Sequence, residues 1–159
     1  MLLPDVVFKN MIKVKKLLTL IMLALMPVSA LALEFRSVAV AKATLYDAPS
    51  ISAKKIFLLS QYYPVEIIVN LGEWLKVRDS QGSISWVEAK QLSAKRMVMM
   101  TNSSEIKQSA ESTSTVVATL EKGIVLEVLD AQPVNGWIKV KHRDGATGYV
   151  PISVTWGFN

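Results

Sequence analysis

The side chains that could take part in catalysis are few in this sequence of 159 residues. It contains no cysteine, and its one histidine is His142. A thiolate nucleophile, a disulfide framework and a metal site of several histidines are therefore excluded. Asp144 lies near His142 in the sequence, but no serine motif supplies the nucleophile that a general base would activate. We interpret His142 as an exposed turn residue and expect no enzymatic activity, cofactor or metal.

Two glutamates occupy matching positions, Glu66 in the segment PVEII and Glu127 in the segment VLEVL. Each is the outward member of an alternating strand pattern, so we interpret both as solvated surface residues rather than as a catalytic pair. The sequence also has no glycine-rich loop that would hold a phosphate. These observations leave binding, not catalysis, as the chemistry to explain.

The repeated tryptophans are candidates for ligand binding. The peptides WLKVR and WIKVK begin at Trp74 and Trp137, and their alternation of apolar and polar side chains predicts a β-strand in each. In the first strand Leu75 and Val77 share the face that points to the core. Trp74 therefore lies on the opposite, more open face beside charged side chains, and Trp137 has the same position in its own strand.

A partly exposed tryptophan suits a binding platform, because aromatic rings with a polar handle are favoured at interfaces. The predicted ligand-binding residues are these tryptophans and the aromatics that could extend their groove: Tyr46, Trp74, Trp86, Trp137 and Tyr149. The alternative is a tryptophan that lies flat on the protein surface under lysine stems, where it stabilises the fold and binds nothing.

An internal repeat positions these residues. Residues 72–87 align with residues 135–150 without a gap. The matches are Trp74 with Trp137, Lys76 with Lys139, Val77 with Val140, Gly82 with Gly145, Trp86 with Tyr149, and Val87 with Val150. The upstream halves align at a slightly shorter offset, and the difference falls in a loop, where insertions are tolerated. Each copy has about 55–60 residues, which is near the lower limit for an independent core.

Short strands separated by turn residues predict an all-β fold. Asp144-Gly145 and the segment Asp79–Gly82 carry the signals of tight hairpin turns. The other predicted strands are residues 38–45, 55–59, 65–71 and 84–87 in the first copy, and residues 116–120, 124–129 and 147–150 with a strand at Ile106 in the second. Residues 93–100 are predicted to be a connection whose apolar part, residues 97–100, packs between the copies.

These motifs resemble those of the bacterial SH3 domain family. The pattern Gly-x-Trp-apolar-Lys-Val, followed by Asp-Gly and Gly-Tyr-Val, occurs in residues 136–150, and residues 72–87 repeat it with Ser85-Trp86-Val87 in place of Gly-Tyr-Val. The resemblance implies two tandem small SH3-like β-barrels, which we place at residues 33–94 and 95–159. It also implies a module that binds a peptide or peptidoglycan.

The N-terminal segment has the three parts of a secretory signal peptide. Met11–Lys16 is basic, and Leu17–Met26 is an apolar run of about ten residues. Ala30 and Ala32 fit the small-x-small pattern of a cleavage site. We therefore predict export, with the periplasm as the expected location.

The alternative is an uncleaved membrane anchor. Pro27 and Ser29 interrupt the apolar stretch, whereas a spanning helix needs about 20 apolar residues. We therefore assign residues 1–32 to the signal peptide and predict a mature chain that begins at Leu33 and keeps no stable membrane span. A normal basic region starts at Met11, so residues 1–10 are either part of the signal or an upstream mis-start.

The net charge of +5 does not indicate a nucleic-acid partner. Of the 18 basic and 13 acidic residues, four basic and one acidic residue precede residue 33, which leaves 14 minus 12, or +2. Nucleic-acid binding needs clustered lysine and arginine, and the nearest candidate, Lys139–Arg143, is short. The sequence thus predicts an exported binding module for a peptide, peptidoglycan or an envelope protein. The alternatives are a scaffold without wall affinity and a degenerate hydrolase accessory.

Overall fold

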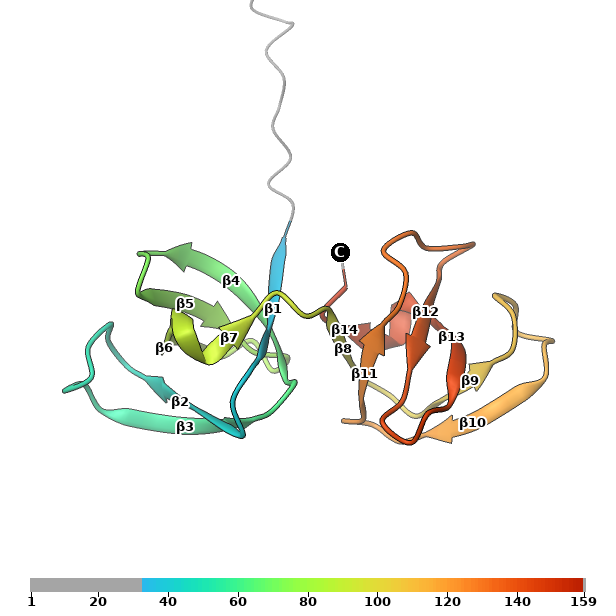
Figure 1. Ribbon diagram of the computed structural model, residues 1–159, viewed down its shortest axis with the longest axis horizontal. Coiled ribbons are helices and arrows are strands. Elements are labelled where there is room, and N and C mark those ends of the chain that lie inside the picture. Colours follow the sequence, from blue (N-terminus) through green and yellow to red (C-terminus); the bar gives the residue numbers. More distant parts are fainter. Residues whose placement is uncertain (1–32, 159) are drawn as a thin grey trace, which may run out of the picture. The chain divides into compact units, whose positions relative to one another are not determined.

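The computed structural model describes residues 33–158, and these fold into β-strands with two short 3₁₀ turns (Figure 1). The predicted signal peptide, with Ala30 and Ala32, lies outside the described residues. The first group of strands is β1 (Glu34–Val38), β2 (Lys42–Tyr46), β3 (Lys55–Ser60), β4 (Pro64–Asn70), β5 (Trp74–Arg78), β6 (Ile84–Glu88) and β7 (Leu92–Ser93). The second group is β8 (Met97–Met100), β9 (Ser104–Lys107), β10 (Val116–Leu120), β11 (Val125–Val128), β12 (Trp137–Lys141), β13 (Thr147–Pro151) and β14 (Thr155–Trp156).

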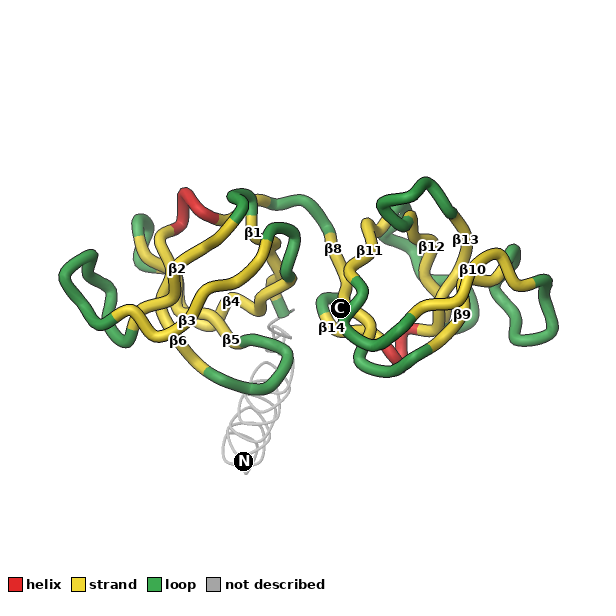
Figure 2. The backbone as a smooth tube through the Cα atoms, turned by 90° about the horizontal axis from the view of Figure 1, so that it is seen from below, coloured by secondary structure: helices red, strands yellow, loops and turns green. Residues whose placement is uncertain are grey.

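Each group forms one seven-stranded antiparallel sheet, and the two sheets have the same strand order. The orders are β3-β2-β6-β5-β4-β1-β7 and β10-β9-β13-β12-β11-β8-β14. The strands of each sheet curl around a core of their own (Figure 2). The predicted all-β fold of two tandem SH3-like barrels is therefore confirmed, and we call strands β1–β7 the first barrel and strands β8–β14 the second barrel. Among residues 33–158, no helix is long and apolar enough to cross a membrane.

The matched positions of the repeat form the two cores. Leu75 and Ile138 are fully buried at the second position of equivalent strands, β5 and β12. The other buried matches are Val77 with Val140, Val87 with Val150, Leu45 with Ile106, and Leu59 with Leu120. The repeat survives in these positions because each barrel must bury a closely packed apolar set to be stable.

Two predicted segments differ from the structure. Residues 38–45 do not form one strand, because β1 ends at Val38 to pair with β4 and β7, whereas β2 begins at Lys42 and pairs with β3 and β6. Residues 93–100 are not merely a connection. Their apolar end is β8, which lies between β11 and β14 in the second sheet, and a short apolar run of this kind is typical of a buried strand.

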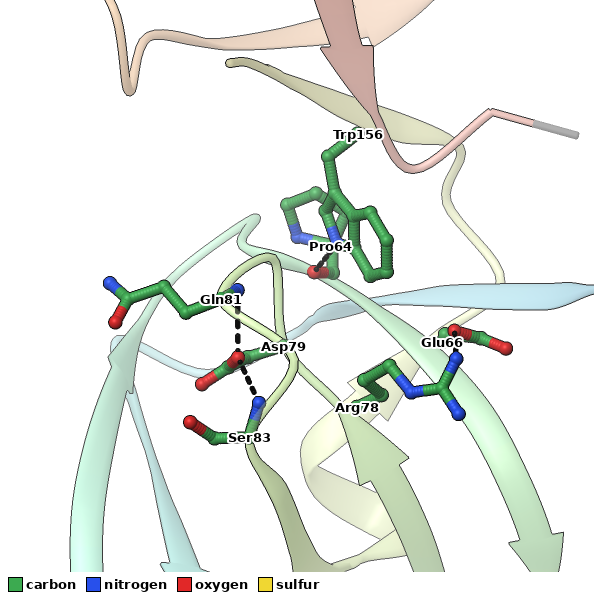
Figure 3. Close-up of polar contacts among 7 residues, drawn as sticks. All are labelled: Pro64, Glu66, Arg78, Asp79, Gln81, Ser83 and Trp156. Atoms are coloured by element: carbon green, nitrogen blue, oxygen red, sulfur yellow. Dashed lines mark hydrogen bonds and ion pairs between the residues drawn. The ribbon is translucent and has the colours of Figure 1, made fainter.

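The predicted hairpin turns are present. The side chain of Asp79 accepts hydrogen bonds from the backbone of Gln81 and Ser83, each at 2.9 Å (Figure 3). Gly82 has a φ of 87°, a left-handed conformation that glycine adopts without a steric cost. The turn thus holds β5 and β6 in the register that places their aromatic side chains.

Contacts of the C-terminal strand join the two barrels, and Leu33–Asn159 form one compact unit. The indole nitrogen of Trp156 donates a hydrogen bond of 3.2 Å to the carbonyl oxygen of Pro64 (Figure 3). The ring of Trp156 also meets the ring of Phe35 edge to face, with centroids 5.2 Å apart. Both contacts tie β14 of the second barrel to the first barrel.

Gly148 lies where β13 approaches β9 too closely for any side chain. A Cβ atom there would lie 2.6 Å from the Cγ2 atom of Ile106 and would overlap the backbone carbonyl of Lys107. We expect Gly148→Ala to lower the free energy of unfolding by about 1–3 kcal/mol, the usual cost of overpacking. Urea unfolding measures this loss. Thr147→Ala, an exposed neighbour on the same strand, should change stability by about 0.5 kcal/mol or less; equal losses in the two variants would contradict the steric argument.

Separation of the barrels gives a second prediction. Every strand pair of the first sheet lies within residues 33–94 and every pair of the second within residues 95–159. Fragments cut there should each show the circular dichroism of a β-sheet protein. They should melt at lower temperatures than the intact chain, because the cut removes the contacts of Trp156 with Phe35 and Pro64. If neither fragment folds, the barrels are not independent.

Candidate ligand-binding surface

Strand alternation places the repeated tryptophans as predicted. Leu75 and Val77 are buried in the first core, whereas Trp74 is half-buried on the other face of β5. Trp137 is likewise half-buried at the start of β12. Neither tryptophan is therefore a core residue, and each presents part of its ring outside the barrel.

In the first barrel the sheet register brings three predicted site residues together. Tyr46 on β2 lies opposite Trp86 on β6, and Trp86 lies opposite Lys76 on β5. The rings of Tyr46 and Trp74 meet edge to face, with centroids 5.3 Å apart and an interplanar angle of 86°. The ammonium of Lys76 lies 5.6 Å from the ring centroid of Trp86, within the range of a cation–π contact. We call these four residues the aromatic face.

Tyr46 has a supporting position in the aromatic face. It is 4% exposed, so almost none of its ring can touch a ligand. Trp74, Lys76 and Trp86 are each half-buried and keep accessible surface. The expectation that Tyr46 extends an open groove does not fit this burial. The ring of Trp74 packs against it, and Trp86 is its cross-strand neighbour. Tyr46 instead supports the Trp74 ring through the edge-to-face contact.

Charged residues that the sequence prediction did not include border the aromatic face. Glu88 lies opposite Trp74 and pairs with Lys90 at 2.7 Å. The hydrogen bond from Lys90 lowers the pKa of the Glu88 carboxyl, and the same bond raises the pKa of the Lys90 ammonium. Gln91 donates to Glu88 at 2.8 Å and accepts from the backbone of Thr44 at 2.9 Å. At neutral pH the border therefore presents one negative and one positive charge.

The second barrel repeats the register with different side chains. Tyr149 lies opposite Lys139 and Lys107, so Lys107 has the position that Tyr46 has in the first barrel. Lys107 pairs with Glu105 at 2.8 Å. Trp137 lies opposite Pro151, which replaces Glu88. Within residues 33–158, the ring-to-ring contacts join Tyr46 to Trp74 and Phe35 to Trp156, so none supports Trp137 or Tyr149.

The five predicted site residues thus divide between the barrels. Tyr46, Trp74 and Trp86 form one cluster, whereas Trp137 and Tyr149 lie on the second sheet. Lys76 was detectable in the sequence because it lies two positions after Trp74 and so shares its face. The Glu88–Lys90 border had no such signal, since it depends on the 3₁₀ turn Ala89–Gln91 that follows β6.

The expected solvent exposure of the repeated glutamates is wrong for Glu66. It is 5% exposed and accepts a hydrogen bond of 3.1 Å from Arg78, which lies opposite it on β5 (Figure 3). Its cross-strand neighbours are Arg78 on β5 and Phe35 on β1, so side chains from both flanking strands lie beside it on the same face of the sheet. Glu127 remains half-buried and pairs with Lys95 at 3.0 Å. The two residues lie in different sheets.

His142 lies in the β12–β13 turn, as predicted, but its ring is mostly covered. The side chain is 17% exposed, and its Nδ1 atom lies 2.8 Å from Asp144. The backbone hydrogen bond from Ala146, and then the contact with His142, lower the pKa of the Asp144 carboxyl. These contacts close the turn around the histidine. Within residues 33–158, no group of three histidine or acidic side chains could hold a metal ion.

The fold and surface define a pair of small β-barrels that carry half-exposed aromatic residues. The family model of the bacterial SH3 domain matches residues 39–94 and again residues 106–157. The chain therefore belongs to the bacterial SH3 domain family. A comparison with curated proteins found no match.

Three solved structures are similar to the chain. NlpC1 from Trichomonas vaginalis is 17% identical with a TM-score of 0.36, and the match covers 80% of this chain and 46% of that one. NlpC2 from the same organism is 15% identical with a TM-score of 0.37, over 80% and 49% of the two chains. An NlpC/P60 family protein from Bacillus cereus is 13% identical with a TM-score of 0.35, over 77% and 56%. The chain thus spans about half the length of each.

Truncation of the two tryptophans should separate their roles. We expect Trp137→Ala to fold with a loss of stability well below the 3–5 kcal/mol that a core tryptophan costs. Trp74→Ala should cost about 0.5–1.5 kcal/mol more, because it also removes the edge-to-face contact with Tyr46. Urea unfolding followed by circular dichroism measures both. Leu75→Ala, a buried neighbour, should cost about 2–5 kcal/mol; a loss this large in Trp137→Ala would make Trp137 a core residue.

Proposed function

We propose that this chain is an exported, non-enzymatic binding module that recognises a peptide or peptidoglycan in the cell envelope. The observation that carries the proposal is the aromatic face of the first barrel, where Trp74 and Trp86 keep accessible surface beside Lys76. The export pattern of residues 11–32 supports a location in the periplasm.

The chemistry of the aromatic face suits a ligand with apolar and charged parts. Indole rings bury a large apolar area and lose little conformational freedom on binding, which makes them effective anchors. Their faces can stack on the apolar face of a sugar ring or on an aliphatic side chain. The paired charges of Glu88 and Lys90 at the border can meet the amino and carboxyl groups of a peptide. Both components occur in peptidoglycan.

The non-enzymatic part of the proposal is supported by the position of His142. Its Nδ1 atom is engaged by the carboxylate of Asp144 in the same turn, and this contact closes the hairpin. The aromatic face lies on β2, β5 and β6, whereas His142 lies in the β12–β13 turn of the other barrel. The proposed ligand surface therefore does not contain the one imidazole of the sequence.

A second candidate function is a protein–protein scaffold without wall affinity. The edge strand β3 favours it, because Ile56, Phe57 and Leu58 are all exposed there, and Phe57 is 62% exposed. An edge strand has unpaired backbone groups that another chain can join by strand addition. Peptide or protein recognition at β3 would not involve the aromatic face.

Binding to insoluble peptidoglycan freed of protein separates the two functions. We expect the wild-type protein to sediment with this material, and Trp74→Ala and Trp86→Ala to weaken the affinity about tenfold or more, since anchors at an interface contribute most of its binding energy. Phe57→Ala, an exposed aromatic outside the aromatic face, should bind as the wild type does. Failure of the wild type to sediment would contradict the wall affinity. A loss of affinity in Phe57→Ala alone would indicate that the ligand binds at β3 rather than at the aromatic face.

A further inference from the structure

A cleft separate from the aromatic face lies where the two barrels meet. This cleft of about 730 Å³ is lined by the base of the β2–β3 hairpin in the first barrel and by the β10–β11 and β12–β13 turns of the second. None of the four residues of the aromatic face lines it. The cleft is therefore separate from the surface proposed above and does not depend on it.

Positive charge is concentrated in this cleft. Its charged walls are Lys42, Lys95, Lys141 and Arg143 against Glu127, a net charge of +3. Residues 33–159 carry 14 basic and 12 acidic side chains, or +2, so the remainder of these residues is close to neutral. A cleft in which one sign of charge predominates focuses the field and raises the local concentration of counter-ions. The ligand of this cleft should therefore be an anion.

The cations of the cleft are available for an anion. Lys141 and Arg143 are exposed, and within residues 33–158 no carboxylate pairs with either of them. Lys42 donates a hydrogen bond of 2.9 Å to the hydroxyl of Ser60, a neutral partner. Lys95 is the exception, because its ammonium lies 3.0 Å from the carboxylate of Glu127. The cleft thus already holds one carboxylate against a lysine.

A strained tyrosine forms part of the cleft wall. Tyr62 has a φ of 69°, in the left-handed region that non-glycine residues rarely adopt. The equivalent position in the second barrel is Gly123, with a φ of 87°. The backbone contacts agree: Tyr62 donates to the carbonyl of Val38 and Gly123 to that of Met100, at equivalent places in β1 and β8. The second barrel therefore has glycine, the residue that this backbone conformation favours, whereas the first barrel has a bulky tyrosine.

The contacts of the Tyr62 ring account for a tyrosine in this unfavourable backbone conformation. It is 42% exposed, so burial in the core does not account for it. The ammonium of Lys95 lies 5.2 Å from the ring centroid, and the same ammonium reaches Glu127 in the second barrel. Tyr62 thus positions Lys95 in the cleft between the barrels. Backbone strain that the core does not require is typical of functional sites.

We propose that this cleft binds a carboxylate-bearing ligand, with Lys42, Lys141 and Arg143 as its cations and Tyr62 as the residue that positions Lys95. A carboxylate accepts paired hydrogen bonds from a guanidinium such as that of Arg143. It can also take the place that the Glu127 carboxylate has on Lys95. The ligand need not be a peptide, because carboxylates occur on acidic peptides and on acidic sugars.

The test uses two fluorescent polymers, poly-L-glutamate and polygalacturonate, with purified protein at low ionic strength. We expect binding of at least one polymer, and an affinity about tenfold lower for the double variant Lys141→Gln/Arg143→Gln. The double variant Lys54→Gln/Lys55→Gln loses the same charge outside the cleft and should bind as the wild type does. The preferred polymer identifies the source of the carboxylate. The proposal would be overturned if the two double variants lost the same affinity, or if the wild-type protein bound neither polymer.

Tyr62→Gly separates binding from folding. Glycine relieves the left-handed backbone, so this variant should unfold at the same temperature as the wild type or higher. It should nevertheless bind the preferred polymer several-fold more weakly, because Lys95 loses its support. The amide resonances of Gly123 and Ile124, which line the cleft, should shift when the wild type is titrated with the polymer. Undiminished binding by Tyr62→Gly would remove Tyr62 and Lys95 from the site.

Discussion

The antiparallel pairing of β5 with β6, and of β12 with β13, is the constraint on which the rest of the structure depends. Because side chains alternate along a strand, one register sends Leu75 and Val77 into the first core and leaves Trp74 on the other face. A slip of one residue would exchange the two sets and expose the core. The surface aromatics are therefore placed by the same interaction that stabilises the barrel.

The two barrels keep the same core and strand order but differ at the surface. Tyr46 supports Trp74 in the first barrel, whereas Lys107 has that position in the second. Glu88 is replaced by Pro151 at the border of the face. The duplicated core preserves the fold of each barrel, while the surface positions of each barrel are free to diverge. The differences favour a division of roles, with the supported aromatic cluster in the first barrel.

The sequence predicted what depends on local pattern. Alternation located the core residues Leu75 and Ile138, and the Asp-Gly signals located the hairpin turns, because both depend on neighbouring residues only. It failed where distant strands decide the outcome. Glu66 has an outward position in its own strand pattern but is buried between Phe35 of β1 and Arg78 of β5, the residues opposite it in the sheet. The cleft at Tyr62 had no signal in either repeat alone, since its walls come from both barrels.

The contacts between the barrels give the cleft a defined shape before any ligand arrives. Two barrels on a free linker would have to lose their relative motion on binding, and that loss weakens affinity. Here Trp156 is hydrogen-bonded to Pro64 and packs on Phe35, while Lys95 contacts Tyr62 on one side and Glu127 on the other. These contacts already restrict the relative motion of the two barrels, so less of that motion is lost when a ligand binds. The short strand β14 at the end of the chain therefore supports the cleft without lining it.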